Sequence, residues 1–118
     1  MEILSVNEVI ENLNKYAGKN VYLYGLLVWE FENECISHLP AGERKDGFNQ
    51  SSIWLSCSPL LKFETRAMKK LGHKPVLVEG LVLAPDPELG GCGHLSHWPA
   101  EIVATDIERY KVQWASKV

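Results

Sequence analysis

The spacing of apolar residues changes along the chain, and the first regular stretch predicts a helix. Over residues 5–17, apolar side chains recur every three or four positions, which is the spacing of one helix face. Ser5 and Glu8 form the capping-box pair that marks a helix N-terminus, and Gly18 supplies a C-terminal stop. The pattern therefore predicts a helix over residues 5–17.

After Gly18 the apolar period becomes two, which is typical of strands. Gly25 and Gly80 lie inside such segments, where glycine often marks a bend or a close approach. A second helix is predicted over residues 59–71, with Ser58 as its N-cap. Five strands are predicted, and their ranges are 21–28, 35–39, 52–57, 75–83 and 100–109.

The order of these elements is helix, three strands, helix and two strands, which is the pattern of an OB-type barrel. We therefore expect a mainly β protein with two helices: a five-stranded antiparallel OB-like barrel with an N-terminal helix and a helix between strands three and four. A chain of 118 residues fits one domain. Residues 1–118 are expected to form a single OB-like domain, with the barrel at about 20–110.

Four segments of the chain resemble a group of small bacterial OB-type proteins. In that group a helix leads into a YxGKxVxVxG strand that ends in an EFE-like turn, and the last two strands carry a VEG and then a GH segment. The resemblance covers roughly residues 5–110 and implies the OB fold. Small acidic domains of this kind also resemble immunity proteins, which neutralise a partner toxin. The matching segments are NKYAGKNVYLYGLLVWEFE, SSIWLS, PVLVEGLVL and GHLSHWPAEIVATDIERY.

Composition and charge narrow the classes of function. The net charge of −3 and the absence of a basic stripe argue against binding through nucleic-acid phosphates. The N-terminus has no basic region followed by an apolar run, and no apolar stretch is long enough to span a bilayer. We therefore expect a cytoplasmic protein with no membrane contact. The odd count of cysteines (Cys35, Cys57 and Cys92) indicates reduced thiols.

Two short clusters contain residues that zinc prefers. Cys92-x-His94-x-x-His97 places three such residues close together, and Cys35-x-x-His38 offers another pair. Neither spacing is that of a standard zinc finger, and the alternative is a pair of loop histidines beside buried thiols. Motifs such as GxSxG, the Walker loop and HExxH do not occur. We therefore predict no cofactor, no catalytic residues and no enzyme activity, with a small metal-binding or enzymatic domain as a lesser alternative.

Two classes of macromolecular partner stay open. An OB face could bind single-stranded nucleic acid by stacking bases on aromatic rings, but the acidic balance does not favour this alternative. The rings available are Tyr22, Tyr24, Trp29, Phe31, Phe48, Trp54 and Trp98. Aromatic residues with carboxylates nearby instead suit a basic protein partner. The carboxylates are Glu30, Glu32, Glu34, Asp86 and Glu88.

We therefore predict a non-enzymatic protein that binds and neutralises a protein partner, such as a basic toxin domain. Its binding surface is expected where the loop after strand one, the loop at 40–51 and the loop at 84–99 converge. For Trp98, the alternative is that its ring fills the end of the barrel. The predicted partner-binding residues are Trp29, Glu30, Phe31, Glu32, His94, His97 and Trp98.

Overall fold

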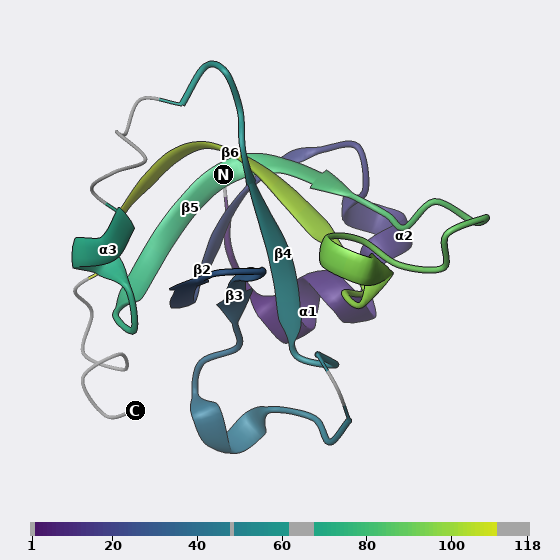
Figure 1. The fold of residues 1–118 in the computed structure, drawn as a ribbon, viewed down its shortest axis with the longest axis horizontal. Helices are drawn as coiled ribbons and strands as arrows, with labels where there is room; N and C mark the ends of the chain where they lie inside the picture. The colour runs from purple at the N-terminus through teal and green to yellow at the C-terminus, as the bar shows by residue number, and fades with distance from the viewer. Residues whose placement is uncertain (1, 48, 62–67, 111–118) are drawn as a thin grey trace.

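The computed structural model of the protein describes residues 2–47, 49–61 and 68–110 (Figure 1). Within these residues the fold is mainly β, with three α-helices, two 3-10 turns and a six-stranded mixed sheet. The elements are β1 (Ile3–Ser5), α1 (Val6–Glu11), α2 (Leu13–Tyr16), β2 (Asn20–Glu30), β3 (Asn33–Ser37), η1 (Ala41–Glu43), β4 (Ser52–Cys57), α3 (Met68–Leu71), β5 (Pro75–Leu83), η3 (His94–Ser96) and β6 (Glu101–Arg109).

The strands form a closed series of pairings. Their order is β1-β2-β3-β4-β6-β5, and β2 also pairs with β5, so five of the six strands form a ring. The prediction of a wholly antiparallel sheet is wrong, because β4 runs parallel to β6. Strand directions cannot alternate all the way round a ring with an odd number of strands, so one parallel pair is unavoidable. The short strand β1, which pairs in parallel with β2, was not predicted from the sequence.

The predicted helix at 5–17 is present as two short helices. The Glu8 backbone N–H donates to Ser5 Oγ at 3.2 Å, as the capping box requires, and Gly18 follows α2 with a φ of +83°. Asn12 separates α1 from α2 with φ −122° and ψ 38°. Its side-chain Nδ2 and its backbone N–H both donate to the Glu8 carbonyl, and this local competition disfavours a continuous helix.

The second predicted helix is described only near its C-terminal end, in α3. Residues 62–67 of the predicted range lie outside the described residues. The prediction that this helix begins at Pro59 is wrong, because residues 59 and 60 form a turn. Ser58 Oγ accepts the Leu60 N–H at 3.0 Å, and the Ser58 carbonyl accepts the Leu61 N–H at 3.0 Å. Ser58 therefore stabilises a turn here.

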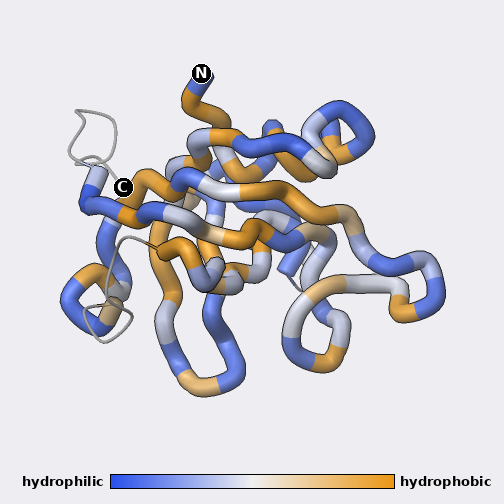
Figure 2. Tube along the Cα trace, turned by 90° about the horizontal axis from the view of Figure 1, so that it is seen from above, coloured by the Kyte–Doolittle hydropathy of each residue, from blue (hydrophilic) through white to orange (hydrophobic). Residues whose placement is uncertain are grey.

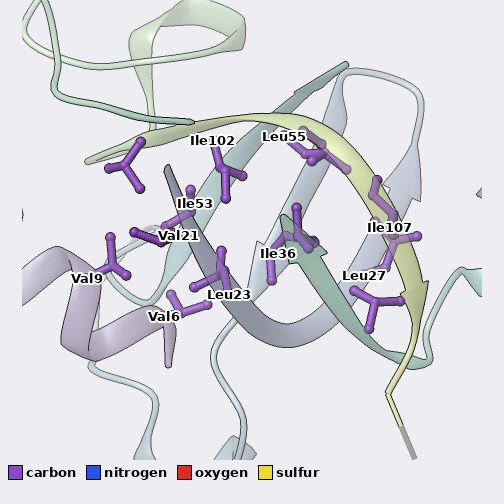
Figure 3. Packing of buried hydrophobic residues seen from close by; sticks show 14 of the residues in the cluster. Val6, Val9, Val21, Leu23, Leu27, Ile36, Ile53, Leu55, Ile102 and Ile107 are labelled. Carbon is purple, nitrogen blue, oxygen red and sulfur yellow. The ribbon is translucent and has the colours of Figure 1, made fainter. Parts of the chain in front are cut away.

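The main core lies between the strands and is closed by α1 (Figure 3). Alternate residues of each strand face it, as the period of two requires. Val6 and Val9 of α1 point into the same cluster, next to Val21 and Leu23 of β2. The largest of its fully buried side chains are Leu23, Leu27, Ile36, Ile53, Leu55, Met68, Ile102 and Ile107.

Gly25 and Gly80 lie inside strands at close approaches, as predicted. A Cβ at Gly25 would lie 2.6 Å from the Ser37 carbonyl oxygen, and one at Gly80 would lie 2.4 Å from the Val103 carbonyl oxygen. The β5–β6 register also shifts between Glu79 and Gly80, which is a β-bulge. Both positions therefore require glycine because a neighbouring backbone fills the space of a side chain.

Hydropathy separates the strands from their connections (Figure 2). The hydrophobic positions gather along the central strands, while the connecting loops are mainly hydrophilic with isolated apolar residues. The connection between β5 and β6 projects from the sheet and contains η3 (Figure 1). No helix in the described part of the chain is long and apolar enough to cross a membrane.

Candidate functional site

The loop between β5 and β6 packs on the face of the sheet that points away from the main core. Trp98 of this loop forms a second buried cluster with Cys92 and with Cys35 of β3, and Val28 and Trp54 pack against it. The rings of Trp54 and Trp98 lie 4.7 Å apart between centroids, tilted by 57°. Neighbouring residues in β3 and β4 belong to the main core, so alternation places this cluster on the opposite face. Trp98 therefore anchors the loop and does not fill the interior of the ring.

A backbone bridge fixes the tip of this loop. The Cys92 N–H donates to the Trp98 carbonyl at 2.8 Å, and the Trp98 N–H donates to the Cys92 carbonyl at 3.0 Å. Between them, Gly93, Leu95 and Ser96 have positive φ values of 74°, 57° and 56°. Positive φ is uncommon for residues other than glycine, and such conformations persist where the surrounding structure enforces them. Here the Cys92–Trp98 bridge and the burial of the Trp98 ring enforce these conformations.

The loop tip, the turn between β2 and β3, and Asn49 enclose a pocket of about 270 Å³, which we call the rim pocket. His94 Nε2 lies 3.2 Å from Glu32 Oε2, which links the loop to the turn. Asn49 Nδ2 donates to the His97 carbonyl at 3.4 Å, which links the loop to the segment before β4. The pocket thus joins the three loops named in the sequence analysis. Its lining residues are Glu32, Asn33, Asn49, His94, Leu95, His97 and Trp98.

The other predicted site residues lie outside the rim pocket. Phe31 is at the tip of the β2–β3 turn, next to Glu32, and is 91% exposed. Trp29 packs against the main core. Glu30 faces the connection between α3 and β5, where its Oε2 lies 3.7 Å from His73 Nε2. The structure therefore gathers four of the seven predicted residues in one pocket. Phe31 is next to one of these four, Glu32, in the sequence, and Trp29 and Glu30 make their contacts elsewhere.

Three residues of the rim pocket were missed by the sequence analysis. Asn33 and Asn49 lie in stretches predicted to be a turn and a loop, so their neighbourhood was recognised but not their contribution. Leu95 lies between two predicted site residues and is 70% exposed. A large apolar residue between two histidines in a turn-rich loop was the available signal.

The five candidate zinc ligands are not brought together. Cys35 and Cys92 belong to the second buried cluster, while His94 and His97 line the rim pocket. His38 is buried elsewhere, and its Nδ1 accepts the backbone N–H of α1 residue 7 at 3.0 Å. In the part of the chain that the structure describes, no group of three His, Cys, Asp or Glu side chains could hold a metal ion.

All three cysteines are free, and each favours its protonated form. Burial, with a smaller effect of Glu101, raises the pKa of the Cys92 thiol to about 11. Burial also raises the pKa of Cys35, although hydrogen bonds from neighbouring side chains oppose the rise. The pKa of Cys57 rises through burial and the nearby Glu34. Because the thiolate is the nucleophile and the metal ligand, none of the three is activated.

Most rings considered for base stacking are at least partly covered. Trp54 and Trp98 pack on each other, and Trp29 packs on the main core. Tyr22 lines a small depression together with the carboxylates of Glu79, Asp106 and Glu108, which would repel phosphates. Tyr24 is half-buried, Phe31 is exposed, and Phe48 lies outside the described residues.

Comparison with known proteins identifies a fold but no family. No family model matches the chain, and no curated protein matches it. Among solved structures, it is similar to a DUF3299-family protein from Pseudomonas aeruginosa PAO1, with 12% sequence identity and a TM-score of 0.52. The alignment covers 83% of this chain and 65% of that one, so the chain spans less than two thirds of that protein. At this identity the likeness shows the fold alone.

Proposed function

We propose that this protein is an OB-type binding module without catalytic activity, and that it binds a protein partner. The binding surface consists of the rim pocket with Phe31, and we call it the docking surface. In OB barrels, ligands bind beside the loops after the first and fourth barrel strands. Here those loops are the β2–β3 turn and the β5–β6 connection, which meet at the rim pocket.

The observation that carries this proposal is the exposure of two large apolar residues, one in the lining of the rim pocket and one next to Glu32 of that lining in the sequence. Phe31 is 91% exposed and Leu95 is 70% exposed. Both belong to segments held in place, since Glu32 pairs with His94 and the Cys92–Trp98 bridge closes the loop. Exposed apolar groups with a polar rim are typical of protein interfaces, where aromatic residues often dominate the binding energy.

Charge and ring packing favour a protein partner over single-stranded nucleic acid. The chain has a net charge of −3, and nucleic-acid binders of this type use a positively charged groove. Trp54 and Trp98, on the outer face of the sheet, are packed against each other and so are not free to stack bases. The acidic balance suits a basic partner such as a toxin domain, by charge complementarity.

The absence of catalysis is supported by the state of the strongest nucleophiles in the chain. Cys35, Cys57 and Cys92 all have raised pKa values, so little thiolate forms near neutral pH. These thiols serve as apolar groups in the packing around the loop and the sheet.

The proposal can be tested by placing a photo-crosslinking amino acid at residue 31 or residue 95 in the source cells. Ile3 provides the control position, because it is also apolar and 41% exposed but lies on β1, paired with Tyr22 at the opposite end of β2 from the turn. We expect the same protein adduct from positions 31 and 95 and not from position 3. Nucleic-acid adducts, or no adduct specific to positions 31 and 95, would contradict the proposal.

The crosslinked protein must then be identified, purified and titrated against the whole chain. We expect Phe31→Ala and Leu95→Ala each to weaken binding by about tenfold or more, a loss of at least roughly 1.4 kcal/mol. Ile3→Ala should leave the affinity unchanged. A purified partner that binds all three variants as tightly as the wild type would show that the docking surface is wrong.

A further inference from the structure

We propose that the rim pocket receives one arginine side chain of the protein partner, with Glu32 as the carboxylate that pairs with its guanidinium. This inference rests on the proposed function, because it names the group that enters the same site. It is carried by the size of the pocket, the charge of its lining and the exposed ring of His97.

The size of the rim pocket limits its occupant. A volume of about 270 Å³ is at the lower end for small-molecule sites, which usually measure some hundreds of Å³. It can hold one long side chain but not a folded segment. A partner that covers Leu95 and its neighbours in the lining would therefore place a single side chain in the pocket.

The charge of the lining favours a cation. Among the described residues, Glu32 is the one carboxylate in the lining, and its side chain is 50% exposed. Its contact with His94 is an ion pair only when that imidazole is protonated. Asn49 already donates through Nδ2 to the His97 carbonyl, so its amide oxygen is left to accept from a ligand. A guanidinium offers several N–H donors in one plane and can bind a carboxylate and a neighbouring acceptor together.

Asn33 complements this arrangement from the turn. Its Oδ1 accepts from Cys35 Sγ at 3.5 Å, which leaves the amide nitrogen to donate. A backbone carbonyl of the partner, next to the inserted side chain, would be a suitable acceptor. The pocket therefore offers acceptors for the cation and a donor for the peptide that carries it.

The rings and apolar edge of the pocket favour arginine over lysine. His97 and Trp98 both line it, with centroids 6.4 Å apart and planes tilted by 37°. Trp98 is buried beneath the pocket, so His97 offers the exposed ring, on which a planar guanidinium can stack. A lysine ammonium is instead a compact and strongly hydrated charge. Leu95 lies at the edge, where it can contact the methylene stem of the side chain.

The inference can be tested on the isolated protein with small probes and NMR. The probes are the acetyl and N-methylamide derivatives of arginine, lysine and citrulline; citrulline has nearly the shape of arginine but no charge. We expect the arginine compound to shift the side-chain amide signals of Asn33 and Asn49 saturably, the lysine compound to bind more weakly, and the citrulline compound to leave them unchanged.

Two variants with the same change in charge complete the design. Glu32→Gln should weaken binding of the arginine compound by about fivefold or more, as expected when a charge-assisted hydrogen bond is lost. Glu88→Gln is the control, because Glu88 is an exposed carboxylate in the same loop but is not part of the pocket lining. Equal losses in the two variants, equal shifts with citrulline, or no saturable shift with arginine would contradict the assignment.

The purified partner separates failure of this inference from failure of the proposed function. If the partner loses affinity for Phe31→Ala but binds Glu32→Gln as tightly as the wild type, only the arginine assignment is wrong. If the partner is indifferent to Phe31→Ala, the docking surface itself is wrong.

Discussion

The molecule has two buried clusters on opposite faces of the same strands, and they differ in what closes them. The main core is aliphatic and draws on nearly every described element, with α1 covering one side. Within the described residues, the second cluster has three buried members, Cys35, Cys92 and Trp98, and is closed by a loop. The first therefore holds the sheet together, while the second holds one segment of chain in an unusual backbone conformation.

This difference shows how stability and binding are divided. Removing a side chain from the main core disturbs every strand that packs there, whereas removing one from the second cluster releases the loop that lines the rim pocket. Binding residues commonly lie on loops that a rigid scaffold positions. Variants in the two clusters should therefore separate loss of folding from loss of binding.

The largest effect is expected from Leu23→Ala in the main core. Leu23 is fully buried in β2, and such a truncation costs about 2–5 kcal/mol of unfolding free energy because a cavity remains. Urea denaturation followed by circular dichroism measures this loss. Leu89→Ala is the control, since Leu89 is 67% exposed and its truncation should change stability by about 0.5 kcal/mol or less. Similar losses in the two variants would show that the main core is not where the structure places it.

A smaller effect is expected from Gly93→Ala in the second cluster. A Cβ at Gly93 would lie 2.4 Å from Trp54 Cδ2, and the φ of +74° already disfavours any side chain. Gly90 has a φ of +73° and no atom within 4 Å of a Cβ, so Gly90→Ala bears the backbone cost without the clash. We expect Gly93→Ala to destabilise by about 1–3 kcal/mol more than the control, as overpacking does.

The backbone at Gly93 adds to this cost, because its ψ of −161° with positive φ is nearly limited to glycine. Tryptophan signals separate the two causes. The near-ultraviolet circular dichroism of the Trp54–Trp98 pair should change in Gly93→Ala and stay as in the wild type in Gly90→Ala. Identical spectra and stabilities would mean that the loop does not pack on Trp54.

The sequence predicted the strands better than the helices. The bounds of β4 and β5 match the predicted ranges 52–57 and 75–83, because strong alternation there ends at clear turn residues. The break at Asn12 and the short strand β1 were missed. Asn12 acts through side-chain competition, and β1 exists only because β2 lies beside it. Neither is visible in a local hydrophobic pattern.

The residues of the candidate site could be predicted only where the sequence indicated which loops lie close together. Glu32, His94 and Trp98 meet because the fold brings the two loops to one place. Trp29 could have been excluded, since the period of two puts it on the same face of β2 as Leu27, towards the main core. The contact of Asn49 with the His97 carbonyl joins residues far apart in the chain, and no local pattern specifies it.

On the main-core side, His38 should make stability depend on pH. Burial lowers the pKa of His38 from 6.5, although Glu43 opposes this, and Nδ1 must stay unprotonated to accept the Asn7 backbone N–H. A lowered pKa means that the unfolded chain takes up the proton first as the pH falls. The contribution of His38 to the free energy of unfolding should therefore be constant above pH 6.5. It should decline as the pH falls below 6.5, until the pH passes the pKa of His38 in the folded state.

His38→Asn tests this dependence, because an asparagine oxygen can accept the same N–H but does not titrate. Urea midpoints measured over a pH series should show a shallower decline below about pH 6.5 in the variant than in the wild type. Parallel curves would show that another group causes the acid sensitivity.

The smallest effect on stability is expected at the docking surface, from His94→Gln. The side chains of His94 and Glu32 are 37% and 50% exposed, and such pairs contribute about 0–1 kcal/mol. Binding should respond differently. His94 Nε2 lies 3.2 Å from Glu32 Oε2, so a partner guanidinium that pairs with Glu32 must compete with this contact.

His94→Gln should therefore tighten binding of the arginine compound, because the imidazole no longer occupies Glu32. His73→Gln is the control, because His73 lies 3.7 Å from Glu30, is also exposed, and has no place in the rim pocket. If both variants bind the arginine compound more tightly, the cause is the change in the net charge of the protein and not competition at Glu32. A loss of stability in His94→Gln as large as that in Leu23→Ala would make the rim part of the folding core, and the division between the two clusters would not hold.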